Sequence, residues 1–383
     1  MRRLLDALGA EEQLTRYVGG AIRDDLLRLP VSDIDLATRI APDEVVRRLE
    51  AARIKAVPTG IDHGTVTAIS DGHPFEITTL RRDVSSDGRR ATVAFTDDWR
   101  EDAARRDFTI NALSADPLTG ELFDYFGGLD DLKDRRIRFI GDPLQRIAED
   151  HLRILRFFRF HARFGAGEPD PAGLDACANR ANDLMALSRE RIADELLKLL
   201  AVDDPAPTVA IMLERGIFKP VLPEIEPDRL CDLEALIKAE IAAGVQADPL
   251  RRLAALLPRS PELAEDVAVR LRLSTKARKR LGCAADTTLG QSPRLLAYRV
   301  GTVCAVDRLL FAGRIDDAAA IAGWRPPRLP IGGGALIERG LPQGPLVART
   351  LKRIDQRWAE AGFPDGDGLE AIVAEAVEEA LDD

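Results

Sequence analysis

The stretch Tyr17–Leu36, YVGGAIRDDLLRLPVSDIDL, constrains the fold more than any other part of this 383-residue chain. A short run with an apolar end is followed by Gly19 and Gly20, and Arg23 comes three residues later. This order predicts a strand, a tight turn and a helix that starts near Ala21. The free backbone N–H groups of such a turn and helix start suit a triphosphate. We therefore expect Gly19, Gly20 and Arg23 to bind nucleotide phosphates.

Two aspartates, Asp33 and Asp35, follow that helix, which we expect to end at Pro30. Ile34 and Leu36 alternate with them, which predicts a strand with both carboxylates on one face. Two neighbouring carboxylates repel each other unless a cation lies between them. Mg²⁺ fits because it prefers oxygen ligands and leaves positions open for phosphate. A bare D-x-D is more often a solvated strand edge, and the preceding glycine turn favours the metal site.

The pattern GG-x-x-RD followed by D-x-D resembles the signature of the polymerase-β-like nucleotidyltransferases. Within them, it resembles the class II tRNA CCA-adding enzymes and the bacterial poly(A) polymerases. The resemblance implies an α+β fold: a small polymerase-β-like α/β head followed by an all-helical neck, body and tail. It also implies that Asp33 and Asp35 are catalytic and hold Mg²⁺, in a two-metal site for attack at phosphorus.

Composition limits the partners of the chain. A net charge of −10 argues against a protein that coats nucleic acid indiscriminately, but a local basic face for RNA remains compatible with it. The N-terminus has no long apolar run, so we expect no membrane partner. The widely spaced Cys177, Cys231, Cys283 and Cys304 match no zinc pattern, and we expect reduced core thiols in a cytoplasmic protein.

Alternating strands and helices up to about residue 135 predict the head, residues 1–138, around one small sheet. Glu76 lies in the predicted strand Pro74–Thr79, with its apolar neighbours facing away from it. We expect Glu76 to be a third catalytic carboxylate, which deprotonates the attacking hydroxyl or supports a metal; a surface glutamate is the open alternative. The polar stretch 82–92 predicts a mobile loop between two strands.

The octet Arg105–Ala112, RRDFTINA, is the next motif of the head. On a helix, Arg106 and Asn111 would face a nucleotide, because arginine suits phosphate or ribose oxygens and asparagine both donates and accepts. The octet resembles the ribose-recognition motif of the family, so we assign Arg106, Asp107 and Asn111 to nucleotide binding. The glycines of the following segment, 124–132, predict a hinge or close packing between head and neck.

Residues 139–203 predict a helical neck that selects the base. Its helix at 146–164 carries a polar stripe at steps of three residues, formed by Asp150, Arg153, Arg156 and Arg159. Asp150 and Arg153 together offer an acceptor beside donors, an edge that favours C and A over U and G. In the family this E-D-x-x-R motif acts as a protein template. A salt-bridged solvent face is the alternative. Ser188 predicts an N-cap, and Arg191–Glu195 an i,i+4 pair.

Helical patterns continue through a body, residues 204–310, and a tail, residues 311–383, which we expect to contact tRNA. The stretch 270–280 is strongly basic. We expect it either to contact RNA phosphate or to form a solvated helix end. The sequence does not determine the oligomeric state, and we expect a monomer or a dimer.

The motifs together predict an enzyme that adds C, C and A to the acceptor end of tRNA from CTP and ATP, with no DNA partner. A poly(A) polymerase and a partial enzyme that adds only CC or only A are the alternatives of the same class. A catalytically silent RNA-binding protein is the alternative from another class. The stretch Pro58–Thr67 resembles the CCA-adding version, because the basic insertion of poly(A) polymerases is absent there.

Overall fold

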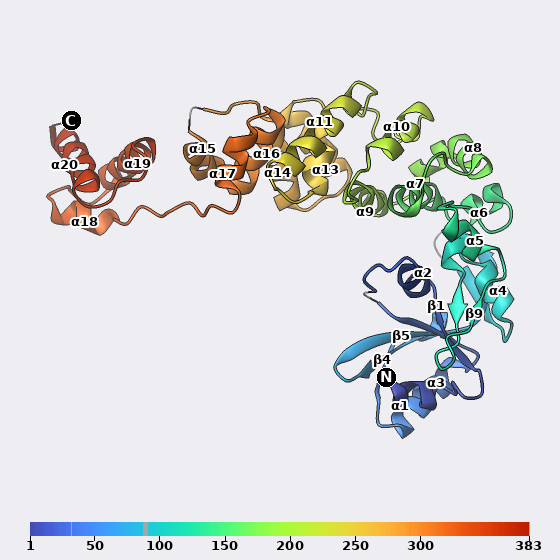
Figure 1. Cartoon of the computed structure of the whole chain (residues 1–383). Helices are drawn as coiled ribbons and strands as arrows, with labels where there is room; N and C mark the ends of the chain where they lie inside the picture. Colours follow the sequence, from blue (N-terminus) through green and yellow to red (C-terminus); the bar gives the residue numbers. More distant parts are fainter. Residues whose placement is uncertain (32, 87–90, 291, 383) are drawn as a thin grey trace. The chain divides into compact units, whose positions relative to one another are not determined.

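The computed structural model describes residues 1–31, 33–86, 91–290 and 292–382, and it confirms the α+β class. The chain forms two compact units, Met1–Pro223 and Glu224–Asp383. The first unit contains the sheets and the helices up to α10, and the second contains helices (Figure 1). The finer division into head, neck, body and tail stays a prediction. In the described part of the chain, no helix has both the length and the apolarity that a membrane span needs.

The main sheet has seven strands in the order β3-β4-β5-β2-β1-β8-β9. Its strands are β1 Thr15–Val18, β2 Asp35–Thr38, β3 Lys55–Gly60, β4 Thr65–Ser70, β5 His73–Thr79, β8 Ser114–Ala115 and β9 Leu122–Phe123. The pair β2–β5 is parallel, and the other neighbouring pairs are antiparallel. The strand predicted at Pro74–Thr79 is therefore confirmed as β5.

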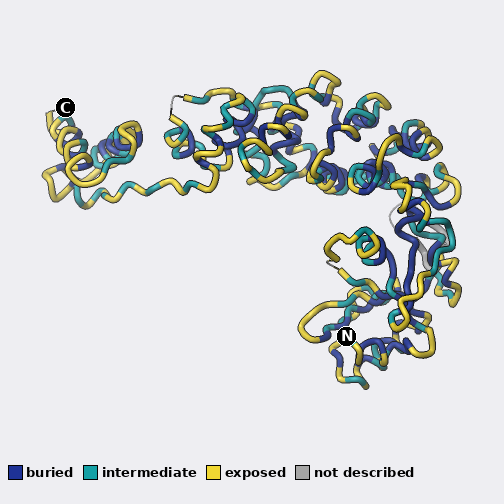
Figure 2. Tube along the Cα trace, in the orientation of Figure 1, coloured by how far each residue is buried: buried dark blue, intermediate teal, exposed yellow. Residues whose placement is uncertain are grey.

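One face of the sheet is covered by α1 (Arg2–Ala7) and α3 (Pro42–Ala51), whose apolar side chains pack on β2, β4 and β5. In Figure 2, which has the orientation of Figure 1, the buried stretches of these strands and helices are dark blue. Leu36 and Ile77 belong to this core. Because side chains alternate along a strand, their neighbours Asp35 and Glu76 lie on the opposite face, where both are exposed. The core thus determines which face of the sheet carries the carboxylates.

The helix α2 (Gly20–Leu26) follows the glycine turn as predicted, but it does not extend to Pro30. It ends because Arg28 adopts a left-handed conformation with φ 57°. The amide of Leu29 donates to the carbonyl of Asp24, and the amide of Arg28 donates to that of Asp25. These are the two bonds of a Schellman turn, which satisfies the last carbonyls of a helix without a proline.

The prediction of a mobile loop at 82–92 is wrong for residues 82–86 and 91–92, which the structure describes as strands. Strands β6 (Arg81–Ser86) and β7 (Ala91–Phe95) pair there as an antiparallel hairpin. The polar side chains suggested irregular structure, but backbone pairing does not require apolar side chains on both faces. Residues 87–90, at the tip of the predicted loop, lie outside the described residues.

A cluster of phenylalanines joins the motif after α4 (Trp99–Ala104) to the helix α7 (Arg153–Phe164). The ring of Phe108 lies 5.0 Å from that of Phe139 and 5.1 Å from that of Phe160, measured between centroids. Phe157 stacks on Phe139 at 5.5 Å. Aromatic pairs at these separations add packing energy to the area they bury. The cluster therefore fixes the octet at 105–112 against the helix that carries Arg153 and Arg156.

Gly128 shows close packing rather than a hinge. It begins α5 (Gly128–Lys133), and a Cβ atom on it would lie 2.3 Å from the carbonyl oxygen of Thr109. Thr109 starts the short 3₁₀ helix Thr109–Asn111. Only glycine allows this approach of two backbones, so α5 supports the turn that carries Asn111.

A short 3₁₀ helix, Ile61–His63, links β3 to β4, and the remaining elements of the first unit are helices that surround α7. They are α6 Pro143–Glu149, α8 Pro171–Asn179, the 3₁₀ helix Ala181–Ala186, α9 Arg189–Leu200 and α10 Ala206–Glu214. The second unit begins with α11 Arg229–Ala242, α12 Pro249–Ala255, α13 Pro261–Arg270, α14 Thr275–Ala285, α15 Pro293–Val300 and α16 Thr302–Phe311. It continues with α17 Ile315–Ile321, α18 Gly333–Glu338, α19 Pro345–Glu360 and α20 Asp367–Asp382.

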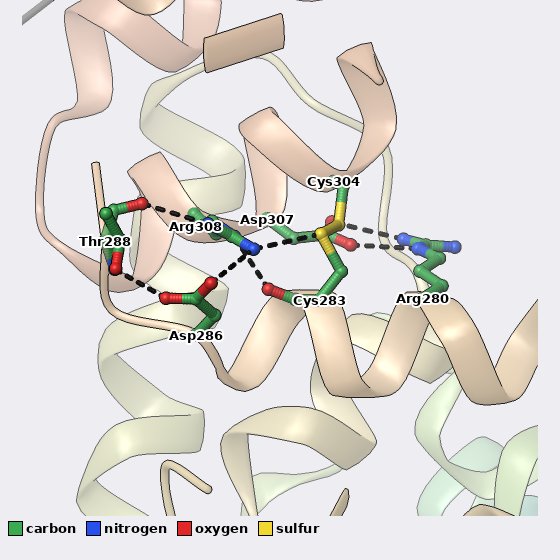
Figure 3. The surroundings of a disulfide bond; sticks show 7 residues. All are labelled: Arg280, Cys283, Asp286, Thr288, Cys304, Asp307 and Arg308. Carbon is green, nitrogen blue, oxygen red and sulfur yellow. Dashed lines mark hydrogen bonds and ion pairs between the residues drawn. A yellow bond between two sulfur atoms is a disulfide. The ribbon is translucent and has the colours of Figure 1, made fainter. Parts of the chain in front are cut away.

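The expectation of four reduced core thiols is wrong. Cys283 on α14 and Cys304 on α16 form a disulfide, with their Cα atoms 6.2 Å apart (Figure 3). Helix packing brings these residues together although 21 positions separate them in sequence. Beside the disulfide, Arg308 donates to the carbonyl oxygen of Cys283 at 2.7 Å (Figure 3). Of the other two cysteines, Cys177 is buried and Cys231 is exposed.

The basic stretch 270–280 is largely engaged in ion pairs within the second unit. Arg280 contacts Asp248 and Asp307, each at 2.8 Å, and Arg270 contacts Glu224 at 2.7 Å. These arginines hold helices together, so they offer fewer charges to RNA than the sequence suggested. Lys276 and Lys279 are exposed.

Candidate active site

The predicted nucleotide-binding residues meet in one pocket of about 480 Å³ in the first unit. The residues that line it are Gly19, Gly20, Arg23, Asp35, Arg105, Arg106, Asp107, Asn111, Asp150, Leu152, Arg153, Arg156, Phe160 and Arg191. They come from β2, the glycine turn with α2, the octet, the segment between α6 and α7, α7 itself and the start of α9. Three predicted site residues are not among them: Asp33, Glu76 and Arg159.

The glycine turn forms one wall of the pocket. Gly19 has a φ of 75°, a conformation that a side chain makes costly. A Cβ atom on Gly19 would also lie 2.9 Å from Nη1 of Arg106. Position 19 therefore requires glycine for two reasons: the positive φ of the turn and the close approach of the Arg106 side chain.

The carboxylates lie on adjacent strands beside the pocket. Asp35 and Glu76 are register partners in the parallel pair β2–β5, as the prediction of a third carboxylate requires. Asp33 lies two residues before Asp35 and outside the strand, which begins at Asp35. Although both side chains are exposed in part, the surrounding groups desolvate the Asp35 carboxylate and raise its pKa; the charge of Asp33 raises it further, whereas Arg106 opposes the shift. The pKa of Glu76 is raised by the same partial desolvation and by the charge of Asp35.

These carboxylates fit a magnesium site that substrate completes. In the described part of the chain, no three His, Cys, Asp or Glu side chains gather closely enough to hold a metal by themselves. Nucleotide-processing sites typically bind Mg²⁺ through one or two carboxylates, waters and substrate phosphates. Asp33 and Asp35 supply two hard oxygen donors, and their mutual repulsion is what a cation would relieve. The residues present therefore suit Mg²⁺ together with a bound triphosphate.

Arg23 is more deeply engaged than the sequence suggested. Its Nη1 donates to Oδ1 of Asn111 at 2.5 Å, and its Nη2 lies 2.6 Å from Oδ1 of Asp24. The guanidinium also lies over the ring of Phe164, 4.2 Å from the centroid. Burial lowers the pKa of Arg23, which Asp24 partly offsets. Arg23 thus brings a positive charge to the pocket wall while it orients Asn111.

The octet does not continue as the regular helix that we expected. It turns after α4, so that Asp107 and Asn111 point at each other, with Nδ2 of Asn111 donating to Oδ1 of Asp107 at 2.9 Å. Arg106 donates to the carbonyl oxygen of Asn111 at 3.3 Å. Burial would raise the pKa of Asp107, but the guanidinium of Arg156 outweighs it, and the pKa lies below its usual value. Asp107 is therefore a charged anchor between the octet and α7.

The predicted single helix at 146–164 is wrong, because the chain breaks between α6 and α7. Asp150 is extended, with φ −153°, and its Oδ1 accepts from the amide of Leu152 at 3.1 Å. Such a side-chain bond to the backbone competes with helix continuation. The break places Asp150 at the pocket wall, where its Oδ2 accepts from Nη2 of Arg191 at 2.7 Å.

Arg153 is held firmly at the start of α7. Its Nη1 donates to Glu149 at 2.5 Å and to the carbonyl oxygen of Arg146 at 3.0 Å. Its Nη2 donates to the carbonyl oxygen of Arg105 at 3.0 Å. A guanidinium has five N–H donors, so these three bonds fix the side chain and leave two donors.

The predicted pair Arg191–Glu195 is wrong as well. Glu195 is buried and accepts from Nε of Arg159 at 2.5 Å, and Arg156 lies 3.7 Å away. Arg156 also contacts Asp107 at 2.6 Å. Arg156 and Arg159 therefore tie α7 to α9 and to the octet, and neither contacts Asp150 through an observed bond.

Sequence reasoning missed four residues that line the pocket: Arg105, Leu152, Phe160 and Arg191. The sequence singled out Arg191 through its i,i+4 spacing to Glu195, and that spacing suggested the wrong partner. Arg105 is adjacent to the predicted Arg106, and its Nε contacts Asp102 at 2.8 Å. Leu152 and Phe160 received no role from the sequence, and no local pattern marks them as pocket residues.

Comparisons with known proteins show which families and sequences this chain resembles. Residues 15–138 match the family model of the poly A polymerase head domain, and residues 168–229 match the model described as "Probable RNA and SrmB- binding site of polymerase A". The mitochondrial CCA tRNA nucleotidyltransferase 1 of Mus musculus is 33% identical over 382 residues, covering 95% of this chain and 87% of that protein. The CCA-adding enzyme of Streptococcus gordonii is 32% identical over 375 residues, covering 94% and 92%.

Solved structures share the fold over nearly the whole length. The CCA-adding enzyme of Bacillus stearothermophilus in complex with CTP superposes with a TM-score of 0.76 at 24% identity, covering 100% of this chain and 99% of that one. The Thermotoga maritima CCA-adding enzyme complexed with tRNA has a TM-score of 0.68 at 22% identity, covering 99% and 94%. At these identities the likeness is one of fold.

Proposed function

This chain belongs to the family of CCA-adding tRNA nucleotidyltransferases, and from that premise we propose that it adds C, C and A to the 3′ end of tRNA from CTP and ATP. The observation that carries this proposal is the single pocket in which Asp35, the glycine turn, the octet and Asp150 meet. The acceptor end of tRNA and the two nucleotides are the proposed partners. The four-part division, the cytoplasmic location and the oligomeric state stay predictions.

In this proposal Asp33 and Asp35 would hold Mg²⁺. Bound there, the ions would neutralise the developing charge on the phosphates while the tRNA 3′-hydroxyl attacks the α-phosphorus in line, the bond from that phosphorus to the β-phosphate oxygen breaks, and pyrophosphate leaves. Glu76, opposite Asp35 and with a raised pKa, would accept the proton of that hydroxyl or support a metal. The turn at Gly19 and Gly20 would bind the triphosphate through its backbone.

The octet would hold the sugar. Asn111 is oriented by Arg23 on its Oδ1 and by Asp107 on its Nδ2, so its position is fixed before a nucleotide binds. Arg106 lies beside it with a side chain that is 22% exposed, open to ribose or phosphate oxygens. A rigid arrangement of this kind lowers the entropy that binding would otherwise lose.

Asp150 and Arg153 would select the base. Each carboxylate oxygen has two lone pairs, and one bond to Leu152 and one to Arg191 leave acceptors for the amino group of C or A. Arg153 keeps two donors for ring acceptors of the base. U lacks the amino group, and G presents the opposite pattern. Arg156 and Arg159 would act by holding α7 in place.

The decisive experiment is incorporation on a tRNA that lacks its 3′ end, with CTP alone, ATP alone or both, resolved at single-nucleotide steps. With both nucleotides present, we expect addition to stop after C-C-A. Addition that stops at C-C with both nucleotides would indicate a CC-adding enzyme. A second substrate, a tRNA that already ends in C-C, identifies an A-adding enzyme: a single A would be added to it, and nothing to the tRNA that lacks its 3′ end. A long A ladder from ATP alone would indicate a poly(A) polymerase and would overturn the proposal.

A further inference from the structure

A second pocket, unrelated to the first, lies within the second unit. Its volume is about 440 Å³, and its walls come from α11, from the junction of α16 and α17, and from Arg259 in the loop before α13. The wall is mainly apolar, formed by Ala235, Leu236, Ala239, Leu310 and Phe311. Cavities of this size with apolar walls and few polar groups are typical of small-molecule sites.

Arg259 is the polar group that distinguishes this pocket. Its guanidinium carbon lies 3.6 Å from the centroid of the Phe311 ring, so the planar head stacks on the aromatic face. Nη1 of Arg259 is buried and has no hydrogen-bond partner among the described residues. Burial lowers the pKa of Arg259, and the nearby Asp232 only partly offsets this.

Buried arginines elsewhere in the same unit contrast with Arg259. Arg251 contacts Glu240 and Asp307, each at 2.7 Å. Arg280 contacts Asp248 and Asp307, each at 2.8 Å. In the described part of the chain, no carboxylate forms an ion pair with Arg259, and Asp232, whose charge acts on Arg259, lies 3.1 Å from Arg229 instead. The unit therefore supplies anions to its other buried guanidiniums and leaves this one open.

Burying part of a cation without an anion is unfavourable, and a buried donor without a partner costs free energy as well. An anion that entered the pocket would remove both penalties at once. A guanidinium binds planar oxyanions through two parallel N–H bonds. The apolar wall would at the same time bury a hydrocarbon or aromatic body beside Phe311.

We propose that this pocket binds a small organic oxyanion, a carboxylate or phosphate ester with an apolar body, through Arg259 and Phe311. The exposed Lys238 at the rim adds a second positive charge near the entrance. Asp232 at the rim is balanced by Arg229, so it does not cancel the charge of Arg259. The site lies in the unit that does not contain the nucleotide pocket, and it is independent of the function proposed above.

The experiment uses the full-length protein and two fluorinated probes, 4-fluorobenzoate and 4-fluorophenyl phosphate, observed by ¹⁹F NMR. Excess CTP is present throughout to occupy the nucleotide pocket. We expect both probes to bind, and neutral 4-fluorobenzyl alcohol to bind at least about tenfold more weakly, because it lacks the charge that Arg259 would pair. The substitution Arg259→Gln should weaken both anionic probes by about ten- to a hundredfold.

Two further variants make the result specific. Ala235→Trp fills the pocket from its exposed rim and should abolish probe binding without removing any charge. Arg328→Gln, an exposed arginine outside the pocket, makes the same charge change as Arg259→Gln and should leave binding as in the wild type. Thermal melts of each variant establish that the fold is retained.

Two outcomes would overturn the proposal. The first is that neither anionic probe binds the wild-type protein; if both substitutions then weaken the affinity for tRNA about equally, this surface is a contact for RNA backbone phosphate instead. The second is that both probes bind but Arg259→Gln and Ala235→Trp leave their affinity unchanged.

Discussion

Asp35 and Glu76 lie opposite each other in register, on the parallel strands β2 and β5. The two strands are adjacent in the sheet, although α3, β3 and β4 separate them in the chain. The apolar partners Leu36 and Ile77, one residue further along each strand, face the core. The packing of that core therefore sets the two carboxylates on the same exposed face, beside the pocket.

Asp35→Asn should reduce CTP incorporation by about a thousandfold or more, because it removes a charged ligand from the proposed metal site. Glu76→Gln should reduce the rate by about a hundred- to ten-thousandfold if Glu76 is the general base. Single-turnover assays with a tRNA that lacks its 3′ end measure both rates. Affinity for tRNA should stay within about twofold, and turnover retained by Asp35→Asn would contradict the metal assignment.

The ion pair between Asp150 and Arg191 gives a second prediction. Arg191→Gln would leave Asp150 free to rotate, so the preference for CTP and ATP over UTP and GTP should fall by about tenfold or more. Competition assays with paired nucleotides measure this preference directly. The matched control is Arg163→Gln, an exposed arginine on α7 outside the pocket, which should leave the preference unchanged. An unchanged preference in Arg191→Gln would indicate that Asp150 is held by other contacts.

Alternation and turn chemistry explain why the head could be predicted. Polar and apolar residues alternate around Asp35 and Glu76, and this alternation predicts strands. The paired glycines at 19 and 20 predict a tight turn, so both features can be recognised from the local sequence alone. The strands of the sheet and the start of α2 follow from them. The convergence of the octet with Asp150 came from resemblance to a family, since nothing in the local pattern places the two motifs together.

The partners of long polar side chains could not be predicted in the same way. Arg191 is equally well spaced from Glu195 on its own helix, yet it contacts Asp150, because the break after α6 turns that carboxylate toward it. Glu195 meets Arg159 from another helix instead. The pairing of Cys283 with Cys304 depends in the same way on how α14 packs against α16. Such choices are made by tertiary packing, which spacing does not encode.

Asp131 predicts a specific pH dependence of stability. It is buried on α5, accepts from Thr109 at 2.6 Å, and contacts Arg136 and Arg138 at 2.6 and 2.8 Å. Burial alone would raise the pKa of Asp131, but these donors outweigh it, so the pKa lies below its usual value. The charged carboxylate therefore stabilises the fold above its unfolded-state pKa of about 3.9, and this contribution is lost as the pH falls through the lower folded-state value.

Asp131→Asn should lower the melting temperature at pH 7 by about 2–6 °C. This corresponds to about 1–2 kcal/mol, less than for a fully buried pair, because both arginines remain more than one third exposed. Thermal melts at pH 7, 5 and 3 compare the variant with the wild type. The difference should be largest at pH 7 and shrink toward pH 3. A difference that stays constant with pH would mean that the loss comes from packing and not from charge.

The disulfide between α14 and α16 predicts that the second unit responds to reduction. It closes a loop of 21 positions, which by chain entropy stabilises the folded state by about 3 kcal/mol. Melting with and without dithiothreitol should show a lower transition temperature after reduction. The double variant Cys283→Ser/Cys304→Ser should melt like the reduced protein and be insensitive to dithiothreitol. Thiol titration in denaturant should find only Cys177 and Cys231 before reduction. Four titratable thiols in the untreated protein would show that the bond does not form.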